Sequence, residues 1–588
     1  MDSKHVTEST SGQEDIQKTW WKEAIIYQIY PRSFQDSDGD GIGDLNGITS
    51  RLDYIQSLGV DIIWLNPIFL SPNDDNGYDI SDYREIMREF GTMEDFDRLL
   101  KEIHKREMRL VLDLVVNHTS DEHPWFEEAR KSRHNPYYNY YHWWPAEKGE
   151  PPLRLSYFDE EGNAWTYNKS TDSYYLHYFS RKQPDLNWEN PEVRQEIFDM
   201  MRFWFDKGID GFRMDSISLI AKDPSFPLID SKKYPDIFSF YAKEPRLHLY
   251  LHEMNRQVLS KYDCMSVGEG SAVMVDDVAK FVDPAREELN MLYHFDAARI
   301  RNTTLPDNPE SGIDYSLIAL KKMFTEWDKA IDKGWPSIYL GNHDQPRMVS
   351  RFGSDKDEFR ALSTKMLITF LLTMRGTPYW FAGDEIGMRN IRFDRIEDYN
   401  DIDTINRYKK AKAEGKDPQA VLDEQKETGR DNARTPFQWD RSPEAGFTAG
   451  TPWLKVNPDY TWINVADEEK DPTSILNYFK KVVSFRKENP SLIYGSYHLL
   501  DAENPQSYTF LRKTGADTYL IMLNFSHKAA ISTPGIDMSN AHVLLDNYGD
   551  RSHMAPQKDI TLRPFEAIVF QLNHPVYESF IDSLDLLE

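Results

Sequence analysis

The sequence predicts an α/β protein built on an eight-stranded (β/α)₈ barrel, the TIM barrel fold, with an irregular domain inserted after the third strand and an antiparallel β domain at the C-terminus. Short apolar runs rich in β-branched residues alternate with segments of helical period such as 93–103. This alternation is typical of a parallel sheet that is covered on both faces. Eight such runs spread over roughly 450 residues, more than the ~250 of a typical barrel, which indicates long insertions in the loops that follow the strands.

The eight candidate strands follow one another with room for a helix between neighbours. They are residues 24–30, 61–67, 109–115, 211–215, 265–269, 291–295, 337–341 and 377–381. Each has the length and the apolar content of a strand that is buried in a parallel sheet. Several of these runs end in a charged side chain, and in a barrel the carboxyl ends of all strands meet at one face.

The whole chain divides into four expected units. They are a disordered lead-in at 1–18, the catalytic barrel at 19–118 and 182–504, the inserted domain at 119–181, and the C-terminal β domain at 505–588. The inserted segment is rich in Tyr, Trp, His and Pro and poor in helical period, and a second, highly charged insertion spans about 392–430. From about residue 505, short alternating strands separated by turn residues predict an antiparallel sheet.

Charge and composition exclude several classes of function. The chain has 588 residues with 69 Lys and Arg against 97 Asp and Glu, so its formal net charge is −28. This charge would repel nucleic acid and anionic membranes, and no run approaches the ~18 apolar residues of a membrane span. The single cysteine, Cys264, and a polar N-terminus without an apolar segment indicate a cytoplasmic protein. We expect a monomer that binds neither nucleic acid nor membranes.

Three carboxylates follow candidate strands and are therefore expected to converge. Asp215 ends the fourth strand, Glu269 ends the fifth, and Asp344 follows the seventh. Each acid alone could cap a helix, but three together in one crevice are costly unless chemistry uses them. Like charges raise the pKa of at least one group, so that one carboxyl can act as an acid beside an ionised nucleophile. Arg213 points the same way as Asp215 because strand side chains alternate.

The strand ends resemble a known family. Residues 24–31, 113–118, 211–215, 268–269 and 342–344 are similar, in order, to the strand-end motifs of the α-amylase superfamily, glycoside hydrolase family 13. The segments 183–187 and 430–439 are similar to those of its oligo-1,6-glucosidase and α-glucosidase group. The resemblance implies an enzyme that acts on small oligosaccharides and removes glucose from the ends of short α-glucosides.

The resemblance also implies the roles of the residues that carry it. Asp215 would be the nucleophile that forms a covalent glucosyl-enzyme, and Glu269 would be the acid that protonates the leaving oxygen and then the base that activates water. Asp344, with His343, would hold the hydroxyls of the distorted glucose ring. Arg213 would orient Asp215 and keep it ionised, and the outcome would be retention of configuration.

Further positions match residues that bind the substrate. Those that grip the non-reducing glucose would be Asp75, Tyr78, His118 and Arg434, and an Asp75–Arg434 salt bridge is expected to close the pocket behind the sugar. Gln183, Phe158 and Phe179 match weaker motifs. For the two phenylalanines, a core position is as compatible with the sequence as stacking on a sugar.

A glycine-rich acidic loop spans residues 36–44. Its acids stand at alternate positions, as in the calcium loop of an EF-hand, but Gly47 stands where that loop has its bidentate glutamate. The resemblance implies structural Ca²⁺ held by Asp36, Asp38, Asp40, the carbonyl of Ile42, and Asp44. The alternative is a solvated acidic turn.

Three functions compete for this sequence: a hydrolase of sucrose-, isomaltulose-, maltose- or isomaltose-type α-glucosides, a sucrose isomerase that makes isomaltulose or trehalulose, and a non-catalytic transporter subunit. A transporter subunit of this kind should carry a membrane helix and a damaged catalytic set, and this sequence shows neither. Isomerases carry an aromatic clamp for the acceptor sugar where this chain has Ser271, and Gln345 stands as in hydrolases. Ser216, which follows the nucleophile, suggests maltose-like or sucrose-like linkages, or breadth. The hydrolase is the expected function.

Overall fold

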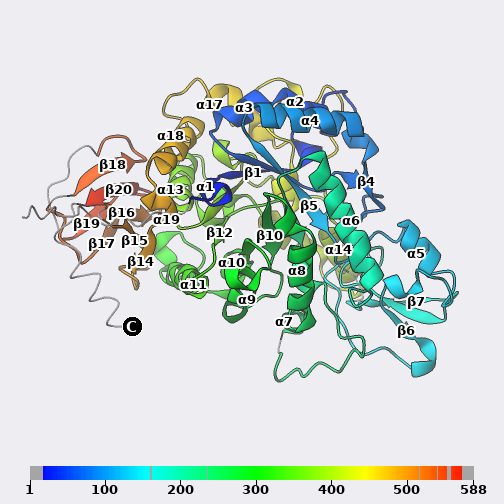
Figure 1. The fold of residues 1–588 in the computed structure, drawn as a ribbon. Helices are drawn as coiled ribbons and strands as arrows, with labels where there is room; N and C mark the ends of the chain where they lie inside the picture. Colours follow the sequence, from blue (N-terminus) through cyan, green and yellow to red (C-terminus); the bar gives the residue numbers. More distant parts are fainter. Residues whose placement is uncertain are drawn as a thin grey trace, which may run out of the picture.

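The computed structural model describes residues 18–158, 162–234, 236–515, 517–539, 541–551 and 558–572. Of the expected lead-in at 1–18, all but the last residue lies outside the described residues, as does the end of the chain from 573. Figure 1 shows the barrel at the centre, with the C-terminal strands on one side and β6, β7 and α5 of the inserted segment on the other.

Eight parallel strands form the barrel, which confirms the predicted fold class. They are β1 (Ile26–Ile29), β2 (Ile62–Leu65), β5 (Arg109–Val115), β9 (Gly211–Asp215), β10 (Met265–Glu269), β11 (Met291–Tyr293), β12 (Ser337–Ile338) and β13 (Thr377–Phe381). Hydrogen-bonded neighbours run in the order β11-β10-β9-β5-β2-β1-β13-β12. The two end strands meet where Ser337 Oγ donates to the Leu292 carbonyl at 2.9 Å, which brings the sheet close to a closed ring.

Helices follow the strands and cover the outside of the barrel. The main ones are α2 (Leu45–Ser50), α3 (Leu52–Ser57), α4 (Met93–Lys105), α6 (Pro191–Lys207), α8 (Arg246–Gln257), α10 (Asp296–Thr303), α11 (Leu317–Ala330), α13 (Arg360–Thr373) and α18 (Ile475–Glu488). Their ends follow the sequence. In α4, Thr92 and Asp95 form a capping box, and α6 begins with Asn190 as its N-cap and ends at Gly208 in the left-handed conformation.

Side-chain alternation divides each barrel strand between two environments. Ile26, Ile62, Val111 and Val267 belong to one buried apolar cluster, separate from the larger cluster that contains their strand neighbours such as Ile63. Because successive side chains point to opposite faces, the first cluster fills the barrel and the second packs beneath the helices. Two residues further along, the inward positions after Val111 and Val267 are Asp113 and Glu269, so the interior becomes charged toward the carboxyl ends of these strands.

Two insertions rise from loops at the carboxyl ends of strands. The first contains α5 (Pro124–Ala129) and a three-stranded antiparallel sheet of β6 (Trp143–Pro145), β8 (Ser173–Leu176) and β7 (Trp165–Asn168). The second follows β13 and contains α14 (Ile402–Ala413), α15 (Pro418–Thr428) and the short helix α16 (Asp431–Arg434). A backbone hydrogen-bond bridge between His118 and Asp185 ties the base of the first insertion to the barrel.

The C-terminal region is an antiparallel sheet, as predicted. Its five strands, in spatial order, are β14 (Ser496–Leu500), β15 (Ser507–Thr514), β16 (Asp517–Asn524), β20 (Ala567–Leu572) and β18 (His542–Asp546), with β17 (Ala530–Ser532) and β19 (Ile560–Leu562) paired beside them. Strand β14 precedes the expected boundary at residue 505 and belongs to this sheet because it pairs with β15.

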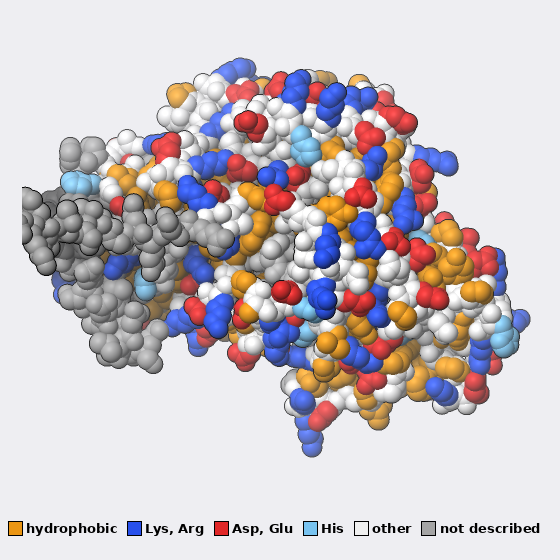
Figure 2. All heavy atoms as spheres, in the orientation of Figure 1, with side chains coloured by type: hydrophobic (Ala, Val, Ile, Leu, Met, Phe, Trp, Pro, Cys, Tyr) orange, Lys and Arg blue, Asp and Glu red, His pale blue; other side chains and the backbone are white. Residues whose placement is uncertain are grey.

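The surface agrees with a chain that carries many charges of both signs. On the face shown in Figure 2, Lys and Arg side chains are interspersed with Asp and Glu. Among the described residues, none of the helices is both long enough and apolar enough to cross a membrane.

Candidate active site

A buried arginine organises the carboxyl end of the barrel. Arg213, on β9, donates from Nη1 to Asp113 Oδ1 at 2.6 Å and to Asp215 Oδ1 at 2.8 Å, and its Nη2 contacts Glu269. Its Nε donates to the Tyr293 hydroxyl at 2.8 Å. One guanidinium therefore joins three carboxylates from three neighbouring strands.

Strand register explains why these groups meet. On β10, Val267 is the partner of Arg213 and Gly268 is the partner of Met214, so Glu269 lies level with Asp215 on the adjacent strand. Neighbouring strands are ~4.8 Å apart and in-register side chains point the same way, which puts the two carboxyls side by side. The convergence that the strand ends predicted for Asp215 and Glu269 is present in the structure.

Burial and the charge of Arg213 act in opposite directions on the carboxyls of Asp215 and Asp113. Burial raises the pKa of Asp215 well above its usual value, the neighbouring Glu269 adds to this, and Arg213 opposes it. Burial also raises the pKa of Asp113 to about 6, against the effect of Arg213. Burial and Glu269 thus oppose the charge of Asp215, and the hydrogen bond from Arg213 is the contact that favours its ionised form.

A second charged cluster lies beside the first and includes Asp344. Asp344 Oδ1 accepts from Arg434 Nη2 at 2.9 Å and from Arg430 Nη1 at 3.2 Å, and Oδ2 lies 3.2 Å from His343 Nε2. Burial alone would raise the pKa of Asp344, but His343 and the two arginines hold it well below its usual range. Asp344 therefore stays ionised, as a residue that accepts hydrogen bonds from sugar hydroxyls should.

The prediction that Asp75 forms a salt bridge with Arg434 is wrong, because Asp75 pairs with a different arginine, Arg430. Asp75 Oδ1 accepts from Arg430 Nη2 at 3.2 Å, whereas Arg434 pairs with Asp344. Arg430 also donates from Nε to Asp401 Oδ1 at 2.6 Å. The two arginines lie one helical turn apart at the ends of α16, so both reach the same side, and spacing along the chain cannot decide between them. Burial raises the pKa of Asp75 to about 6, although Arg430 and Arg434 lower it.

Tyr78, His118 and Gln183 form one network of contacts with Asp75 and His343. The Tyr78 ring stacks on the His343 ring with centroids 5.3 Å apart. His118 Nε2 lies 3.0 Å from the Tyr78 carbonyl, and Gln183 Nε2 donates to Asp75 Oδ2 at 3.3 Å. Burial lowers the pKa of His118 to about 3, so this imidazole is neutral near neutral pH.

The two phenylalanines border the charged clusters and are half-buried. The Phe158 and Phe179 ring centroids are 5.5 Å apart, and Phe179 lies 5.1 Å from the His118 ring. Arg430 lies over the Phe158 ring at 4.8 Å. Both rings therefore touch residues of the candidate site, while Phe179 also packs on the core of the inserted domain.

Sequence reasoning did not assign four residues that take part in these clusters: Asp113, Tyr293, Arg430 and Asp401. A signal existed for Asp113, because it stands two residues after the inward-facing Val111 and is the register partner of Arg213. Arg430 begins a segment that the family resemblance had already marked. No comparable signal pointed to Asp401, which lies in the charged insertion.

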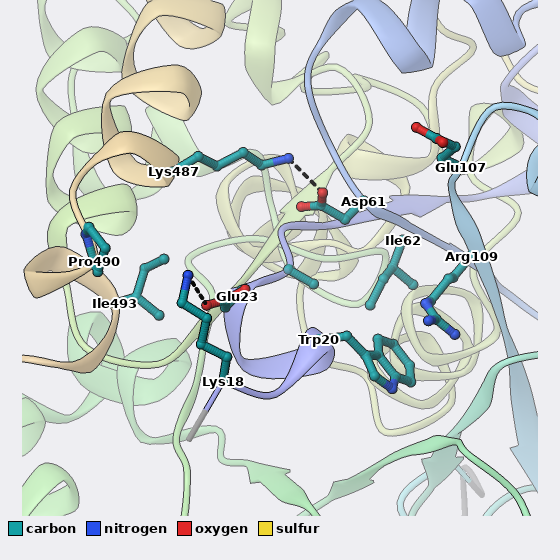
Figure 3. Close-up of a pocket in the computed structure, with 11 residues that line it drawn as sticks. Lys18, Trp20, Glu23, Asp61, Ile62, Glu107, Arg109, Lys487, Pro490 and Ile493 are labelled. Atoms are coloured by element: carbon teal, nitrogen blue, oxygen red, sulfur yellow. Dashed lines mark hydrogen bonds and ion pairs between the residues drawn. The ribbon is translucent and has the colours of Figure 1, made fainter. Parts of the chain in front are cut away.

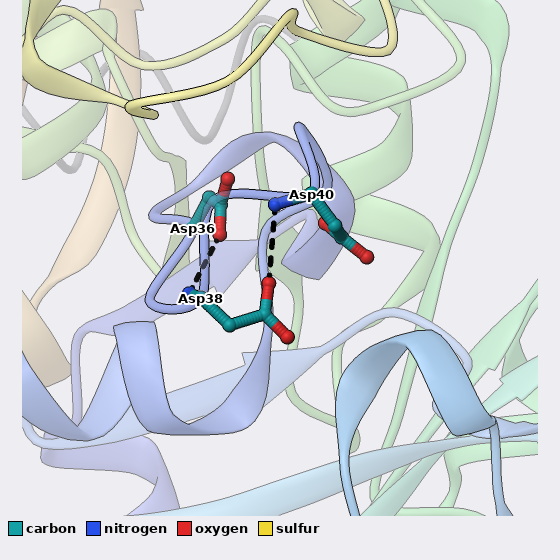
Figure 4. A group of neighbouring side chains, drawn as sticks. All are labelled: Asp36, Asp38 and Asp40. Atoms are coloured by element: carbon teal, nitrogen blue, oxygen red, sulfur yellow. Dashed lines mark hydrogen bonds between the residues drawn. The ribbon is translucent and has the colours of Figure 1, made fainter.

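The acidic loop at residues 36–44 brings three carboxylates together (Figure 4). Oxygens of Asp36, Asp38 and Asp40 lie within 4.8 Å of one another. Burial and the nearby acids Asp38 and Asp36 raise the pKa of Asp40. The Ile42 N–H donates to Asp40 Oδ1 at 2.7 Å, and this hydrogen bond acts in the opposite direction. Asp44 instead caps α2 by accepting from Gly47 N at 2.7 Å. A set of hard oxygen atoms that repel one another fits a cation such as Ca²⁺.

A hollow of ≈340 Å³ lies at the opposite end of the barrel strands (Figure 3). Several of its charged side chains have partners: Lys487 Nζ lies 2.5 Å from Asp61, and Arg109 lies over the Trp20 ring at 4.0 Å. Active sites of this fold lie at the carboxyl ends of the strands. The candidate active site is therefore the pair of charged clusters around Arg213 and Arg430.

A barrel whose strand ends carry this carboxyl pair is the framework of a glycoside hydrolase. Comparison with known proteins agrees, since residues 28–495 match the family described as the catalytic domain of α-amylase. The chain belongs to the α-amylase family, which confirms the resemblance read from the strand-end motifs.

Individual relatives match nearly the whole chain. The oligo-1,6-glucosidase of Parageobacillus thermoglucosidasius is 51% identical over 571 residues, 95% of this chain and 100% of that protein. A trehalose-6-phosphate hydrolase of Bacillus subtilis (strain 168) is 43% identical over 95% of this chain and 99% of that protein. Among solved structures, the trehalulose synthase MutB of Pseudomonas mesoacidophila MX-45 has a TM-score of 0.89 at 42% identity, over 94% of this chain and 99% of that one.

Proposed function

We propose that the protein is a retaining, exo-acting α-glucosidase that hydrolyses short α-glucosides of the sucrose, isomaltulose, maltose or isomaltose type. The observation that carries the proposal is the position of Asp215 and Glu269, level with each other on adjacent strands and joined to one buried arginine. Retaining glycosidases hold their two carboxyls ~5–5.5 Å apart, close to the spacing of neighbouring strands.

The first half of the reaction transfers glucose to the enzyme. Asp215 attacks the anomeric carbon and the bond to the leaving oxygen breaks, while Glu269 gives its proton to that oxygen. Arg213 holds Asp215 through a 2.8 Å hydrogen bond and favours its ionised form. The departing sugar leaves with the proton, and Glu269 is now a carboxylate.

The second half releases glucose. Glu269 takes a proton from water, the water oxygen attacks the anomeric carbon, and the bond to Asp215 breaks. Inversion at each step gives overall retention. Asp344 and His343 would accept and donate hydrogen bonds to the ring hydroxyls of the sugar.

The second charged cluster supports exo action. Arg430 joins Asp75, Asp344 and Asp401, and we expect these paired charges to close one end of the glucose site. A glucose that enters such a pocket meets Asp75, Tyr78, His118, Gln183 and Arg434 at its non-reducing side. A closed wall there admits a chain end and excludes the middle of a polymer.

Product analysis tests the proposal. The purified enzyme is incubated with sucrose, isomaltulose, trehalulose, maltose and isomaltose, and products and their anomeric form are followed by NMR. We expect α-glucose as the first product from at least one of these sugars. First release of β-glucose, or no cleavage of any of them, would contradict the proposed activity.

A second candidate is a sucrose isomerase, which the high structural similarity to trehalulose synthase MutB favours. Against it stand Ser271 in place of an aromatic clamp and Gln345 after Asp344. Without a clamp, released fructose should leave and water should attack. In dilute sucrose we therefore expect glucose and fructose, with transfer products rising only as acceptor concentration rises. Isomaltulose or trehalulose as the main product would favour the isomerase.

We also propose that the loop at residues 36–44 binds structural Ca²⁺. Asp36, Asp38 and Asp40 would hold the ion, with the Ile42 carbonyl and Asp44 as the further ligands that the family resemblance implies. When bound, the ion would neutralise the acidic cluster and tie the loop together.

Location and assembly are proposed with the same function. The single cysteine supports a reducing, cytoplasmic compartment, and the net charge of −28 supports a monomer without nucleic acid or membrane partners. Light scattering at several protein concentrations tests the monomer, and a mass twice that of the chain would contradict it.

A further inference from the structure

The turn that follows Glu269 places a hydroxyl on its carboxyl. Ser271 Oγ donates to Glu269 Oε1 at 2.8 Å. The other oxygen, Oε2, contacts Arg213 and accepts from the Tyr293 hydroxyl at 3.2 Å. Each oxygen of Glu269 thus has its own donors, and Ser271 serves the one that Arg213 does not hold.

The backbone of this turn is held in one conformation. Gly270 N donates to the Tyr293 carbonyl at 2.8 Å, and Val273 N donates to the Gly270 carbonyl at 3.2 Å, which closes the turn. Ala272, its third residue, has φ +60°, a value that favours glycine in a turn of this kind. A non-glycine residue in this region costs energy and persists only where the surroundings impose it.

A second serine fixes the turn from the nucleophile's side. Ser218 lies in the short 3₁₀ helix at Ile217–Leu219, directly after Asp215 and Ser216, and its Oγ donates to the Ser271 carbonyl at 2.5 Å. The loops that follow the two carboxyl-bearing strands are thereby linked. The position of the Ser271 hydroxyl is set by contacts on both sides of the turn.

We propose that Ser271 is a positioning residue for Glu269, a role that rests on the proposed glucosidase function. The Ser271 hydroxyl orients Oε1 and stabilises the carboxylate that remains once the proton has passed from Glu269 to the leaving oxygen. A hydroxyl both donates and accepts, so it can accept from the protonated acid and donate to the carboxylate. Hydrogen bonds to an ionised acceptor are the stronger ones, so the bond strengthens as Glu269 loses its proton.

This role predicts an effect that depends on the leaving group. Ser271→Ala is compared with wild type on the best disaccharide substrate and on 4-nitrophenyl α-glucoside, whose leaving group departs with little help from an acid. We expect kcat/KM on the disaccharide to fall about tenfold, as for a lost hydrogen bond to a charged group, and kcat/KM on the aryl glucoside to fall much less.

The pH profile gives a second readout. A donor to the carboxylate favours release of the proton, so its removal in Ser271→Ala should move the alkaline limb of kcat/KM to higher pH. Ser271→Thr keeps the hydroxyl and should restore both the disaccharide rate and the alkaline limb. Ala272→Gly keeps Ser271 and relieves the left-handed residue, and it should leave the leaving-group dependence as in wild type.

Equal losses on the two substrates with an unmoved pH profile would overturn the inference and leave Ser271 as a packing residue. Wild-type rates in Ser271→Ala would overturn it as well. Both results differ from failure of the proposed function, in which the wild-type enzyme itself would cleave no α-glucoside and Glu269→Gln would change nothing.

Discussion

Two regions of the molecule bury an arginine completely but give it different partners. Arg213, at the carboxyl end of the barrel, contacts Asp113, Asp215 and Glu269. Arg486, on α18 at the junction with the C-terminal sheet, donates hydrogen bonds only to carbonyl oxygens within the described part of the chain. Its guanidinium donates to the carbonyls of Leu372, Met374, Gly376 and Leu492 at 2.6–3.0 Å.

The partners decide what each arginine can do. Leu372 and Met374 lie at the end of α13, where carbonyls lack helical partners and carry partial negative charge. Carbonyls hold a cation without exchanging protons, and burial lowers the pKa of Arg486 to about 9. Burial acts in the same direction on Arg213, yet Asp113 and its other neighbours raise the pKa of that arginine well above its usual value. The junction provides cohesion, while the active site provides groups that can accept a proton or attack a carbon.

The sharpest test of this difference removes the active-site carboxyls. Asp215→Asn and Glu269→Gln should each lower kcat by about 10⁴-fold or more on natural substrates, because each deletes a bond-forming or proton-transfer group. Both variants should melt near the wild-type temperature, because the amides have the size of the carboxyls and Arg213 keeps two carboxylate partners in each variant. Steady-state kinetics and calorimetry on the same preparations measure the two effects.

A crystal structure supplies the geometric check on these variants. The carboxyls of Asp215 and Glu269 should lie ~5–5.5 Å apart. A separation of ~6.5–9.5 Å would mean an inverting enzyme, and wild-type turnover in either variant would remove that residue from the mechanism.

Arg486→Leu should show the opposite pattern. Removing the guanidinium leaves four buried carbonyls without a hydrogen-bond donor. The free energy of unfolding should therefore fall by about 4 kcal/mol or more, while kcat per folded molecule stays the same. Arg441→Leu is the matched control, because Arg441 is 67% exposed and pairs with Asp467 at the surface. Its cost should be ~1 kcal/mol or less.

For Arg486→Leu, denaturant titration measures the free energy of unfolding, and kcat normalised to the titrated concentration of active sites measures turnover per folded molecule. If this variant were as stable as Arg441→Leu, the carbonyl contacts would not stabilise the junction. A loss of turnover at full folding would show that the two regions are coupled rather than independent.

Asp75→Asn should trade binding for stability, with a dependence on pH. The folded pKa of about 6 exceeds the usual 3.8, so folding strengthens proton binding by Asp75. The stability that this provides is complete below the unfolded value and is lost as pH rises through about 6. The variant does not titrate there, so it should gain on wild type, by up to about 3 kcal/mol, as pH rises from about 4 to about 7.

Melting temperatures of both proteins across this pH range test the prediction, and KM near neutral pH should rise in the variant because the proposed contact of Asp75 with the sugar is lost. Arg430 keeps Asp401 and Asp344 as partners, so the change does not leave that cation unpaired. A constant difference in stability at all pH values would show that Asp75 does not titrate in this window.

Much of the fold and of the central site could be predicted because the signals are local. Most barrel strands are largely apolar runs, and Asp215 and Glu269 end two of them, so alternation and parallel order bring these two side chains together. The family resemblance supplied the roles. The start of the C-terminal sheet was less evident, because β14 lies directly after helix α19 (Ser491–Tyr494) and ahead of the longer alternating strands.

What could not be predicted depends on contacts between distant segments. The choice of Arg430 over Arg434 as the partner of Asp75 depends on how α16 lies against the barrel. The hydrogen bond from Ser271 to Glu269 depends on the left-handed backbone conformation of Ala272, which no pattern in the sequence predicts. Asp401 reaches the site from the charged insertion after β13. The charge pattern of that insertion is typical of an ordinary solvent-exposed helix, so it did not single out Asp401.

The smallest expected effect concerns a third arrangement of charge, in which Asp36, Asp38 and Asp40 lie together and the proposed neutraliser is an ion. An ion bound only by the folded chain stabilises it by ~1.4 kcal/mol when free Ca²⁺ is about ten times its dissociation constant. Chelation should therefore lower the melting temperature by a few degrees or less and leave kcat per folded molecule unchanged, since the loop carries none of the reacting groups. Asp38→Asn should weaken Ca²⁺ binding in calorimetry and reduce the response to chelator. Equal melting temperatures with and without chelator, and no bound metal by elemental analysis, would identify the loop as a solvated acidic turn.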